Sequence, residues 1–470
     1  MTSRVAAVIA ALLVAACSSS GSAAGQPTGT TTHDRPDART APTHAIAPEL
    51  GTGPGPAAAW PTYHGNNQRS GVSAAAALKA PLHRAWSRSL DGAVYAQPIV
   101  VGQRLIVATE NNTVYALRRD NGHVIWRRHL GTAVPQSQLP CGNIDPSGIT
   151  GTPAYDRPTG TVFVVTETTG SHHTLRALNW NNGHTRWTRN LDVLSSRDRH
   201  AEQERGALLV AHGRVYTAFG GRYGDCGNYV GYVVSVPTNG SGSTRHYAVP
   251  TAREAGMWAP PGPVQDKTGN DIYVASGNGA EVNGNYDGSD SVIRLSLGLK
   301  RTGLFAPSTW RQDNAQDLDL GSMSPVVDPV TGNIVIAGKR GNVYVLNGLN
   351  GVGKSVAKTL SGCSAFGGAA FLGQIVILPC SDGIRRLDVG GKNSRWNWQV
   401  TGVAGSPVIA GKRVYALNQD SGELNVISFG SGSVVGRISV GSVSRFATPV
   451  PVGNRIYVGT LNGVVAIGGS

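Results

Sequence analysis

The chain has 470 residues, five cysteines and a formal net charge of +13. A basic balance of this size suits an anionic partner, such as an acidic wall polymer or lipid headgroups. No run of Lys and Arg is interleaved with aromatic residues, so we expect no nucleic-acid partner. No segment beyond the N-terminal one is apolar enough to cross a bilayer.

Residues 1–16 are predicted to be a signal peptide. Arg4 precedes an apolar run from Val5 to Val14 that is too short for a transmembrane helix. The run leads to Ala15-Ala16-Cys17, and small residues before a cysteine at this spacing resemble a bacterial lipobox, whose cysteine is acylated. An ordinary secretory signal with a chance cysteine is the alternative. We therefore expect an exported chain, anchored through Cys17 to the outer face of the cytoplasmic membrane or in the periplasm.

Residues 17–59 are predicted to form a flexible tether. They consist mainly of Ser, Gly, Ala, Thr and Pro, without apolar periodicity. Such a segment cannot bury enough apolar surface to offset the entropy cost of ordering. The globular part is therefore expected to occupy residues 60–470.

This globular part is an internal repeat. A short β-branched strand that ends in an aliphatic residue recurs eight times, at intervals of about 40 to 60 residues. A second strand precedes each copy, and Gly with Asn or Asp lies between the two, as hairpins require. The eight copies are Val114–Leu117, Leu175–Leu178, Val233–Val236, Val292–Leu295, Val343–Leu346, Ile384–Leu387, Leu424–Ile427 and Val464–Ile467.

Two further strands complete a copy. Trp126, Trp187 and Trp396 follow their repeat strands at one fixed offset, and each has an aliphatic residue four positions later. An apolar strand led by proline comes next, as at Pro98 and Pro449, because the start of a strand tolerates a missing N–H. Four short strands with Gly-rich turns describe one blade of a β-propeller.

The last copy predicts how the ring closes. Ile467 is three residues from the C-terminus, so this copy has no outer tryptophan strand of its own. Trp86, followed four residues later by Leu90, provides such a strand near the other end. We predict an all-β, eight-bladed propeller of four-stranded blades, in which residues 82–90 complete the last blade with residues 444–470. The alternative is an open solenoid, in which the last copy would not need an outer strand from the N-terminal segment.

Four cysteines remain besides Cys17. An even number fits an oxidising compartment and two disulfides, for which three pairings are possible. Cys363 and Cys380 flank a hairpin-like stretch in one repeat, so we pair them. This choice leaves Cys141 to pair with Cys226.

Two segments carry a family resemblance. The copy from Tyr115-Ala116-Leu117 through Asn121-Gly122 to Trp126, and the opening Trp60–Gly65, resemble the pyrroloquinoline-quinone (PQQ) repeat of the quinoprotein alcohol dehydrogenases. The resemblance covers essentially all of residues 60–470. This repeat is shared by cofactor-using dehydrogenases and by cofactor-free outer-membrane assembly lipoproteins, so it implies a fold and leaves the activity open.

The resemblance also implies candidate site residues. The dehydrogenases bind the planar quinone and a calcium ion at the propeller axis. Trp258 lies where the family stacks the quinone, and Lys339 where a basic residue contacts it. Asp225, Asn278 and Asp317 correspond to hard oxygen ligands for calcium. Asp317 also resembles the catalytic aspartate, which accepts the substrate hydroxyl proton while hydride passes to the quinone.

The departures from the family leave two functions open. Asp225 replaces a glutamate with a one-residue shift, the stretch from Asp313 to Asp317 is one residue too long, and no adjacent cysteine pair or haem motif is present. Asn278 and Asp317 also suit ordinary turns and loop caps. We expect a monomeric binding or scaffolding module that holds an envelope protein or polymer. The alternative is a PQQ- and calcium-dependent alcohol or sugar dehydrogenase.

Overall fold

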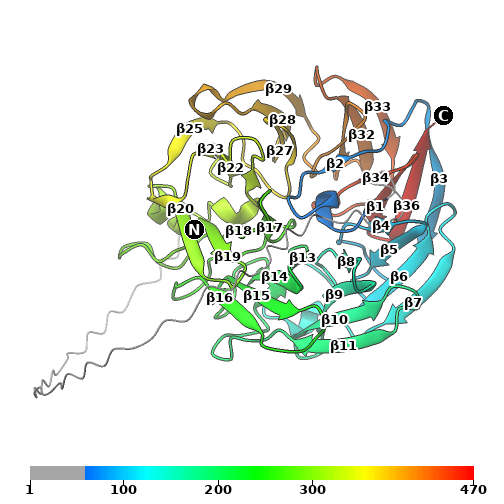
Figure 1. The fold of residues 1–470 in the computed structure, drawn as a ribbon, viewed down its shortest axis with the longest axis horizontal. Helices are drawn as coiled ribbons and strands as arrows, with labels where there is room; N and C mark the ends of the chain where they lie inside the picture. Colours follow the sequence, from blue (N-terminus) through cyan, green and yellow to red (C-terminus); the bar gives the residue numbers. More distant parts are fainter. Residues whose placement is uncertain (1–58, 470) are drawn as a thin grey trace, which may run out of the picture. The chain divides into compact units, whose positions relative to one another are not determined.

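The computed structural model describes residues 59–469, which fold as an all-β propeller of eight blades (Figure 1). The predicted signal peptide, Cys17 and all but the last residue of the predicted tether lie outside this range. Within it, no helix is long and apolar enough to pass through a bilayer. One short α-helix, α1 (Trp310–Ala315), precedes the inner strand of the fifth blade.

The blades follow one another in chain order, and each is an antiparallel sheet that runs from the ring centre outwards. Blades 1 to 4 contain β4 (Ile99–Val101), β5 (Arg104–Ala108), β6 (Thr113–Arg118) and β7 (Val124–His129); β8 (Ala154–Asp156), β9 (Thr161–Thr168), β10 (His172–Asn179) and β11 (Thr185–Asn190); β13 (Leu209–Ala211), β14 (Arg214–Gly221), β15 (Tyr232–Pro237) and β16 (Arg245–Ala248); and β17 (Val264–Gln265), β18 (Asp271–Ala275), β19 (Val292–Ser296) and β20 (Arg301–Ala306).

Blades 5 to 8 repeat this plan with shorter connections. They contain β21 (Val326–Val327), β22 (Ile334–Ala337), β23 (Asn342–Leu346) and β25 (Val356–Ser361); β26 (Ala370–Leu372), β27 (Ile375–Cys380), β28 (Gly383–Asp388) and β29 (Arg395–Thr401); β30 (Val408–Ala410), β31 (Arg413–Asn418), β32 (Glu423–Ser428) and β33 (Val434–Ser439); and β34 (Val450–Val452), β35 (Arg455–Thr460), β36 (Gly463–Gly469) and β3 (Leu82–Ser89). Short additional strands are β1 (Ala59–Trp60), β2 (Val72–Ser73), β12 (Glu202–Glu204) and β24 (Asn350–Val352). All eight predicted repeat strands lie in the third strand of their blade.

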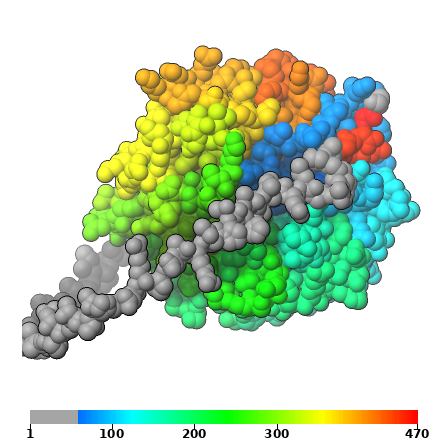
Figure 2. Space-filling view, viewed as in Figure 1, coloured from blue at the N-terminus to red at the C-terminus, as the bar shows by residue number. Residues whose placement is uncertain are grey.

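The last blade is completed by the N-terminal strand β3, as predicted. It pairs antiparallel with β36 along its length, from Leu82 opposite Gly469 to Ser89 opposite Gly463. Figure 2 shows the blue N-terminal segment beside the red C-terminal strands. The ring is therefore closed, and the open solenoid is excluded.

The tryptophans of the outer strands hold neighbouring blades together. The Trp86 indole N–H donates to the Arg119 carbonyl of blade 1, and the Trp126 indole N–H donates to the Trp180 carbonyl of blade 2, both at 3.1 Å. The Trp86 ring covers a turn glycine of the next blade, Gly122, where an added Cβ would lie 2.7 Å from the ring. Gly122 also has a φ of +70°, a conformation that other residues rarely adopt. The repeat therefore needs both the tryptophan and the glycine.

Blade 6 departs from this pattern in one detail. The predicted Trp396 donates backwards, to the Ser361 carbonyl of blade 5, while Trp398 donates forwards to the Phe429 carbonyl of blade 7. The ring of Trp398 also covers a turn glycine, Gly432. Trp398 therefore takes the place that the repeat spacing assigned to Trp396.

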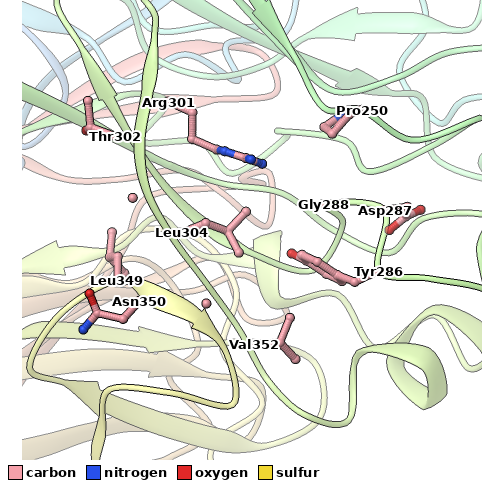
Figure 3. Close-up of a pocket in the computed structure, with 12 residues that line it drawn as sticks. Pro250, Tyr286, Asp287, Gly288, Arg301, Thr302, Leu304, Leu349, Asn350 and Val352 are labelled. Atoms are coloured by element: carbon pink, nitrogen blue, oxygen red, sulfur yellow. The ribbon is translucent and has the colours of Figure 1, made fainter.

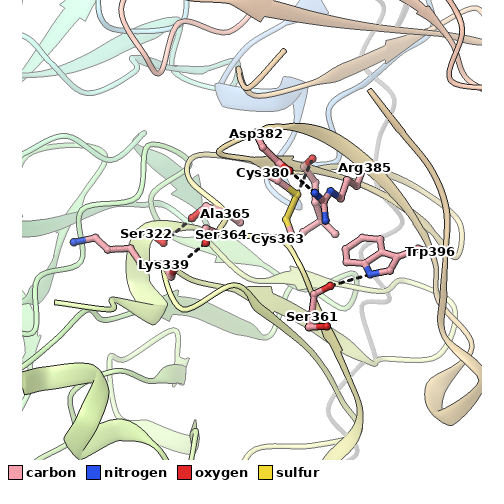
Figure 4. The surroundings of a disulfide bond; sticks show 11 residues. Ser322, Lys339, Ser361, Cys363, Ser364, Ala365, Cys380, Asp382, Arg385 and Trp396 are labelled. Atoms are coloured by element: carbon pink, nitrogen blue, oxygen red, sulfur yellow. Dashed lines mark hydrogen bonds and ion pairs between the residues drawn. A yellow bond between two sulfur atoms is a disulfide. The ribbon is translucent and has the colours of Figure 1, made fainter. Parts of the chain in front are cut away.

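Both predicted disulfides are present. Cys141 and Cys226 join the long connection after blade 1 to the β14–β15 connection, with Cα atoms 6.1 Å apart. Cys363 and Cys380, with Cα atoms 5.0 Å apart, tie the entry of blade 6 to β27 (Figure 4). Disulfides fit an oxidising compartment.

Candidate functional site

Three aromatic rings meet at the propeller axis. Trp258 precedes the inner strand of blade 4, Phe366 that of blade 6 and Phe446 that of blade 8. The Trp258 ring centroid lies 6.4 Å from that of Phe366 and 6.2 Å from that of Phe446. Blades 4 and 8 are opposite each other in an eight-bladed ring, so this contact places the rings at the centre. All three side chains are partly exposed.

Each ring has a cation over it. Lys339 Nζ lies 5.8 Å from the Trp258 centroid, the Arg205 guanidinium 5.7 Å from Phe446, and the Arg445 guanidinium 3.9 Å from Phe366. Cations at such distances are attracted to the negative ring face. We call the six residues Arg205, Trp258, Lys339, Phe366, Arg445 and Phe446 the axial site. Their combination of apolar ring surface and positive charge suits a planar ligand that carries acidic groups.

Lys339 connects the axial site to two aspartates. Its Nζ contacts Asp319 Oδ2 at 2.7 Å and Asp317 Oδ1 at 2.5 Å. The Asp319 carboxylate is buried, and its Oδ1 accepts the Asn278 backbone N–H at 2.6 Å. Burial lowers the pKa of Lys339, but Asp319 and Asp317 outweigh this effect and leave the pKa raised. Burial raises the pKa of Asp319 despite the ammonium beside it.

The segment that follows Cys363 of the blade 6 disulfide contacts the backbone of this lysine (Figure 4). Ser364, next to Cys363, donates its hydroxyl to the Lys339 carbonyl at 2.9 Å. Phe366 follows two residues later on the same connection. The Cys363–Cys380 bond therefore restrains the segment that positions both Lys339 and Phe366.

A second group of acids lies around Tyr229. The Tyr229 hydroxyl donates to Asp225 Oδ1 at 2.5 Å, and Asn278 Nδ2 donates to Glu254 Oε2 at 3.4 Å. Arg253 forms an ion pair with the same Glu254. The pKa of Glu254 is raised, first by burial and then by nearby Asp225 and Asp319. The three carboxylates are therefore close enough to repel one another.

The structure brings the sequence-predicted residues into two connected sets. Trp258, Lys339 and Asp317 form one set, and Asp319 links it to Asn278. Asp225 belongs to the other set, the acids around Tyr229, because it accepts the Tyr229 hydroxyl hydrogen bond. The Asp317 side chain is 60% exposed, so the buried aspartate at this position is its neighbour Asp319.

Sequence reasoning missed several members of the site. Phe366 and Phe446 lie in the connection before an inner strand, as Trp258 does. Their shared position within the repeat could therefore have identified them. Arg205 occupies the same place in blade 3. Glu254 and Tyr229 had no comparable signal, because neither follows the register of the repeat.

The residues at the axis fit the implied quinone, PQQ, better than they fit the implied calcium ion. A planar quinone with carboxylates suits the exposed Trp258 ring and the cations around it. Asp225, Glu254, Asn278 and Asp319 supply oxygen donors of the type that calcium takes. Among residues 59–469, however, no three His, Cys, Asp or Glu side chains are grouped to hold a metal ion.

A separate cavity of about 690 Å³ lies against the outer part of blade 4 (Figure 3). Tyr286, Arg301 and Leu304 are among the side chains that line it. None of the predicted site residues reaches it, so this cavity is distinct from the axial site.

Two buried glutamates near the axis predict a pH dependence. Burial raises the pKa of Glu110 to about 7 and that of Glu204 to about 8. Glu110 accepts the Gly148 N–H at 2.8 Å, and Glu204 accepts the Thr217 hydroxyl at 3.0 Å. An unfolded glutamate has a pKa of about 4.3. The stability that protonation provides should therefore be complete below that value and be lost as pH rises through 7 and 8.

Urea denaturation at pH 5 and pH 9 measures this effect. The protein should be less stable at pH 9, and the Glu204→Gln variant should lose less stability between the two values than the wild type. Asp120→Asn, at an exposed carboxylate, serves as the control. An unchanged pH dependence in the Glu204 variant would show that this carboxyl ionises freely in the folded protein.

The fold is an eight-bladed β-propeller, and the chain is similar to PQQ-repeat propellers in part of its sequence and in its fold. A family model described as outer membrane protein assembly factor BamB matches residues 69–222. No curated protein matches the sequence.

Solved structures of two kinds share the fold. The quinohemoprotein alcohol dehydrogenase from Comamonas testosteroni has a TM-score of 0.68 at 17% identity, covering 88% of this chain and 81% of that one. A europium-containing methanol dehydrogenase has a TM-score of 0.66 at 15% identity, covering 87% and 98%. BamB from Moraxella catarrhalis has a TM-score of 0.56 at 17% identity, covering 83% and 98%. At these identities the similarity shows the fold alone.

Proposed function

We propose that this protein is a binding module of the cell envelope, and that its axial site captures an anionic ligand with a planar ring. One observation carries the proposal: three partly exposed aromatic rings from separate blades meet at the axis, each with a cation over its face. Rings that only filled the core would not need Arg205, Lys339 and Arg445 beside them. Together these groups provide a stacking surface and a positive charge for a carboxylate or phosphate.

The envelope location rests on two further features. The two disulfides fit an oxidising compartment. The sequence before Cys17 has the form of a lipoprotein signal. In this proposal, acylated Cys17 retains the propeller at the membrane, and the predicted tether of residues 17–59 lets its axial face reach a ligand.

Titration with PQQ, a planar tricarboxylate, tests the axial site. Its binding should quench tryptophan fluorescence, and Trp258→Leu or Lys339→Gln should weaken the affinity by about tenfold, the effect of losing one stacking or charge contact of about 1.4 kcal/mol. Lys354→Gln, at an exposed lysine on a turn, is the matched control for the loss of charge. An uncharged ring compound of similar size should bind more weakly than PQQ. Equal affinities of the wild type and both axial variants would contradict the proposal.

A second function, a PQQ-dependent dehydrogenase, is favoured by the aspartates that contact Lys339 over the Trp258 ring. Bound quinone would supply a hydride acceptor at that ring. Lys339 would orient it, and Asp319, whose pKa is raised by burial, would hold a substrate proton at its carboxylate. Asp317 is the more exposed alternative for this role.

Dye reduction with alcohols and sugars, in the presence of PQQ and calcium, separates the two functions. Ligand binding without turnover supports the binding module. Turnover that Asp319→Asn or Asp317→Asn abolishes, with PQQ affinity retained, supports the dehydrogenase and shows which aspartate acts.

A further inference from the structure

The outer strands of the propeller form a continuous basic band. The fourth strand of each of the eight blades carries at least one Arg or Lys, and none of these strands contains Asp or Glu. In blade 4 the short strand β24, which has no charged residue, pairs with the outer side of this strand. The outer strands β3, β7, β11, β16, β20, β25, β29 and β33 lie around the whole perimeter (Figure 1). The basic residues of this band, which we call the basic rim, are Arg84, Arg88, Arg127, Arg128, Arg186, Arg189, Arg245, Arg301, Lys358, Arg395 and Arg437.

Several cations of the basic rim are exposed to a partner, whereas Arg189 is partly buried and donates to the Gly240 carbonyl, and Arg437 donates to Asn425 Oδ1. Arg84, Arg127, Arg245, Lys358 and Arg395 are exposed and lie on five different blades. No rim cation forms an ion pair with an Asp or Glu of residues 59–469. Positive charges without acidic partners add up to an electrostatic field that concentrates anions around the perimeter.

Protection of the sheet edges does not account for this pattern. Outer strands expose unpaired backbone groups, and charged side chains on them prevent pairing with other chains. A mixture of positive and negative side chains would meet that need and would avoid repulsion between neighbours. A band that excludes every acidic residue instead selects partners by charge.

We propose that the basic rim binds a flexible linear polyanion, a polymer with a carboxylate or phosphate group on each repeat unit. The outer strands face outwards in all directions around the ring, so a flat surface can contact only the blades on one side. A flexible chain can follow the perimeter and contact many blades at once. Most rim cations are arginines, whose planar guanidinium suits both carboxylate and phosphate.

The rim tryptophans argue against a nucleic acid. Proteins that bind single strands stack the bases on free aromatic rings. Trp86, Trp126 and Trp398 instead use their indoles between blades, where each N–H donates to a carbonyl of the next blade. The basic rim therefore offers charge without a stacking surface.

A charge-matched pair of variants tests the proposal. The rim variant combines Arg127→Gln, Arg245→Gln, Lys358→Gln and Arg395→Gln. The control variant removes the same charge from exposed lysines that lie outside the outer strands: Lys79→Gln, Lys267→Gln, Lys354→Gln and Lys392→Gln. Binding is measured with long-chain polyphosphate and poly-glutamate, with phosphatidylglycerol vesicles, and with oligothymidylate.

Both polymers should bind the wild type at low salt and be released as salt increases. The rim variant should bind them about tenfold or more weakly, whereas the control variant should stay within about twofold of the wild type, because binding that rests on charge contacts falls with each contact removed. Trp258→Leu should leave polymer binding unchanged, which separates this surface from the axial site.

Three outcomes would overturn the proposal. Equal losses in the rim and control variants would show that only net charge matters. Vesicle binding that depends on the rim, without polymer binding, would assign the surface to a membrane. Oligothymidylate binding that is tighter than binding of either polymer would assign it to a nucleic acid.

Discussion

Replacement of Arg222 by methionine should lower the free energy of unfolding by about 3–5 kcal/mol, the cost of leaving one charge of a buried ion pair without its partner. Arg222 forms an ion pair with Glu167, and the two side chains are only 1% and 3% exposed. Its guanidinium also donates to the His200 carbonyl at 2.6 Å and to the Ser147 hydroxyl at 3.3 Å. Urea denaturation of the purified protein measures the loss.

Two further variants show whether the charge itself is responsible. The double variant Arg222→Met with Glu167→Leu removes both charges and should recover most of the lost stability, because no buried charge remains. Arg118→Met removes a comparable contact with Asp120 at the surface, where the two side chains are 57% and 52% exposed, and it should change stability little. A double variant that is less stable than Arg222→Met would show that the polar network, and not the charge, sets the cost.

Replacement of Trp86 by alanine should also destabilise the protein strongly, by about 3 kcal/mol, which is at the lower end for loss of a packed tryptophan because Trp86 is only half-buried. The indole joins the last blade to the first: its N–H donates to Arg119, and its ring lies on Gly122 and 6.0 Å from Tyr457. Thermal or urea unfolding measures the change.

Ser87→Ala, at an exposed position of the same strand, is the matched control and should leave stability nearly unchanged. The two variants together distinguish the packing of the indole from the pairing of β3 with β36. If Trp86→Ala were as stable as this control, the backbone pairing alone would close the ring.

The sequence predicts the architecture because the repeat is local. Each third strand, such as Val114–Leu117, is short and apolar, lies between Gly-rich turns and has the same neighbours in every copy. The unmatched strand around Trp86 then predicts the closure, since the last copy has a vacant outer position. The sequence did not predict that Trp398 takes the place of Trp396 in blade 6. Both residues lie on one strand, and only packing decides which of them reaches the next blade.

The axial site was harder to predict because it depends on contacts across the ring. The sequence identifies Trp258 and Lys339 through the family resemblance, but no local pattern shows that Phe446 of the opposite blade meets Trp258. The choice between Asp317 and Asp319 depends on backbone conformation. Asp317 has a φ of +52° and turns outwards, so Asp319 becomes the buried carboxylate.

The position of β3 determines the order in which the molecule can be completed. Translation makes this strand among the first of the propeller, whereas β36, its partner, is made last. A nascent chain that is still being synthesised or exported therefore has a first strand without a partner. The final blade can assemble only after residues 463–469 have been made, and a chain that stops before residue 463 cannot finish the circle.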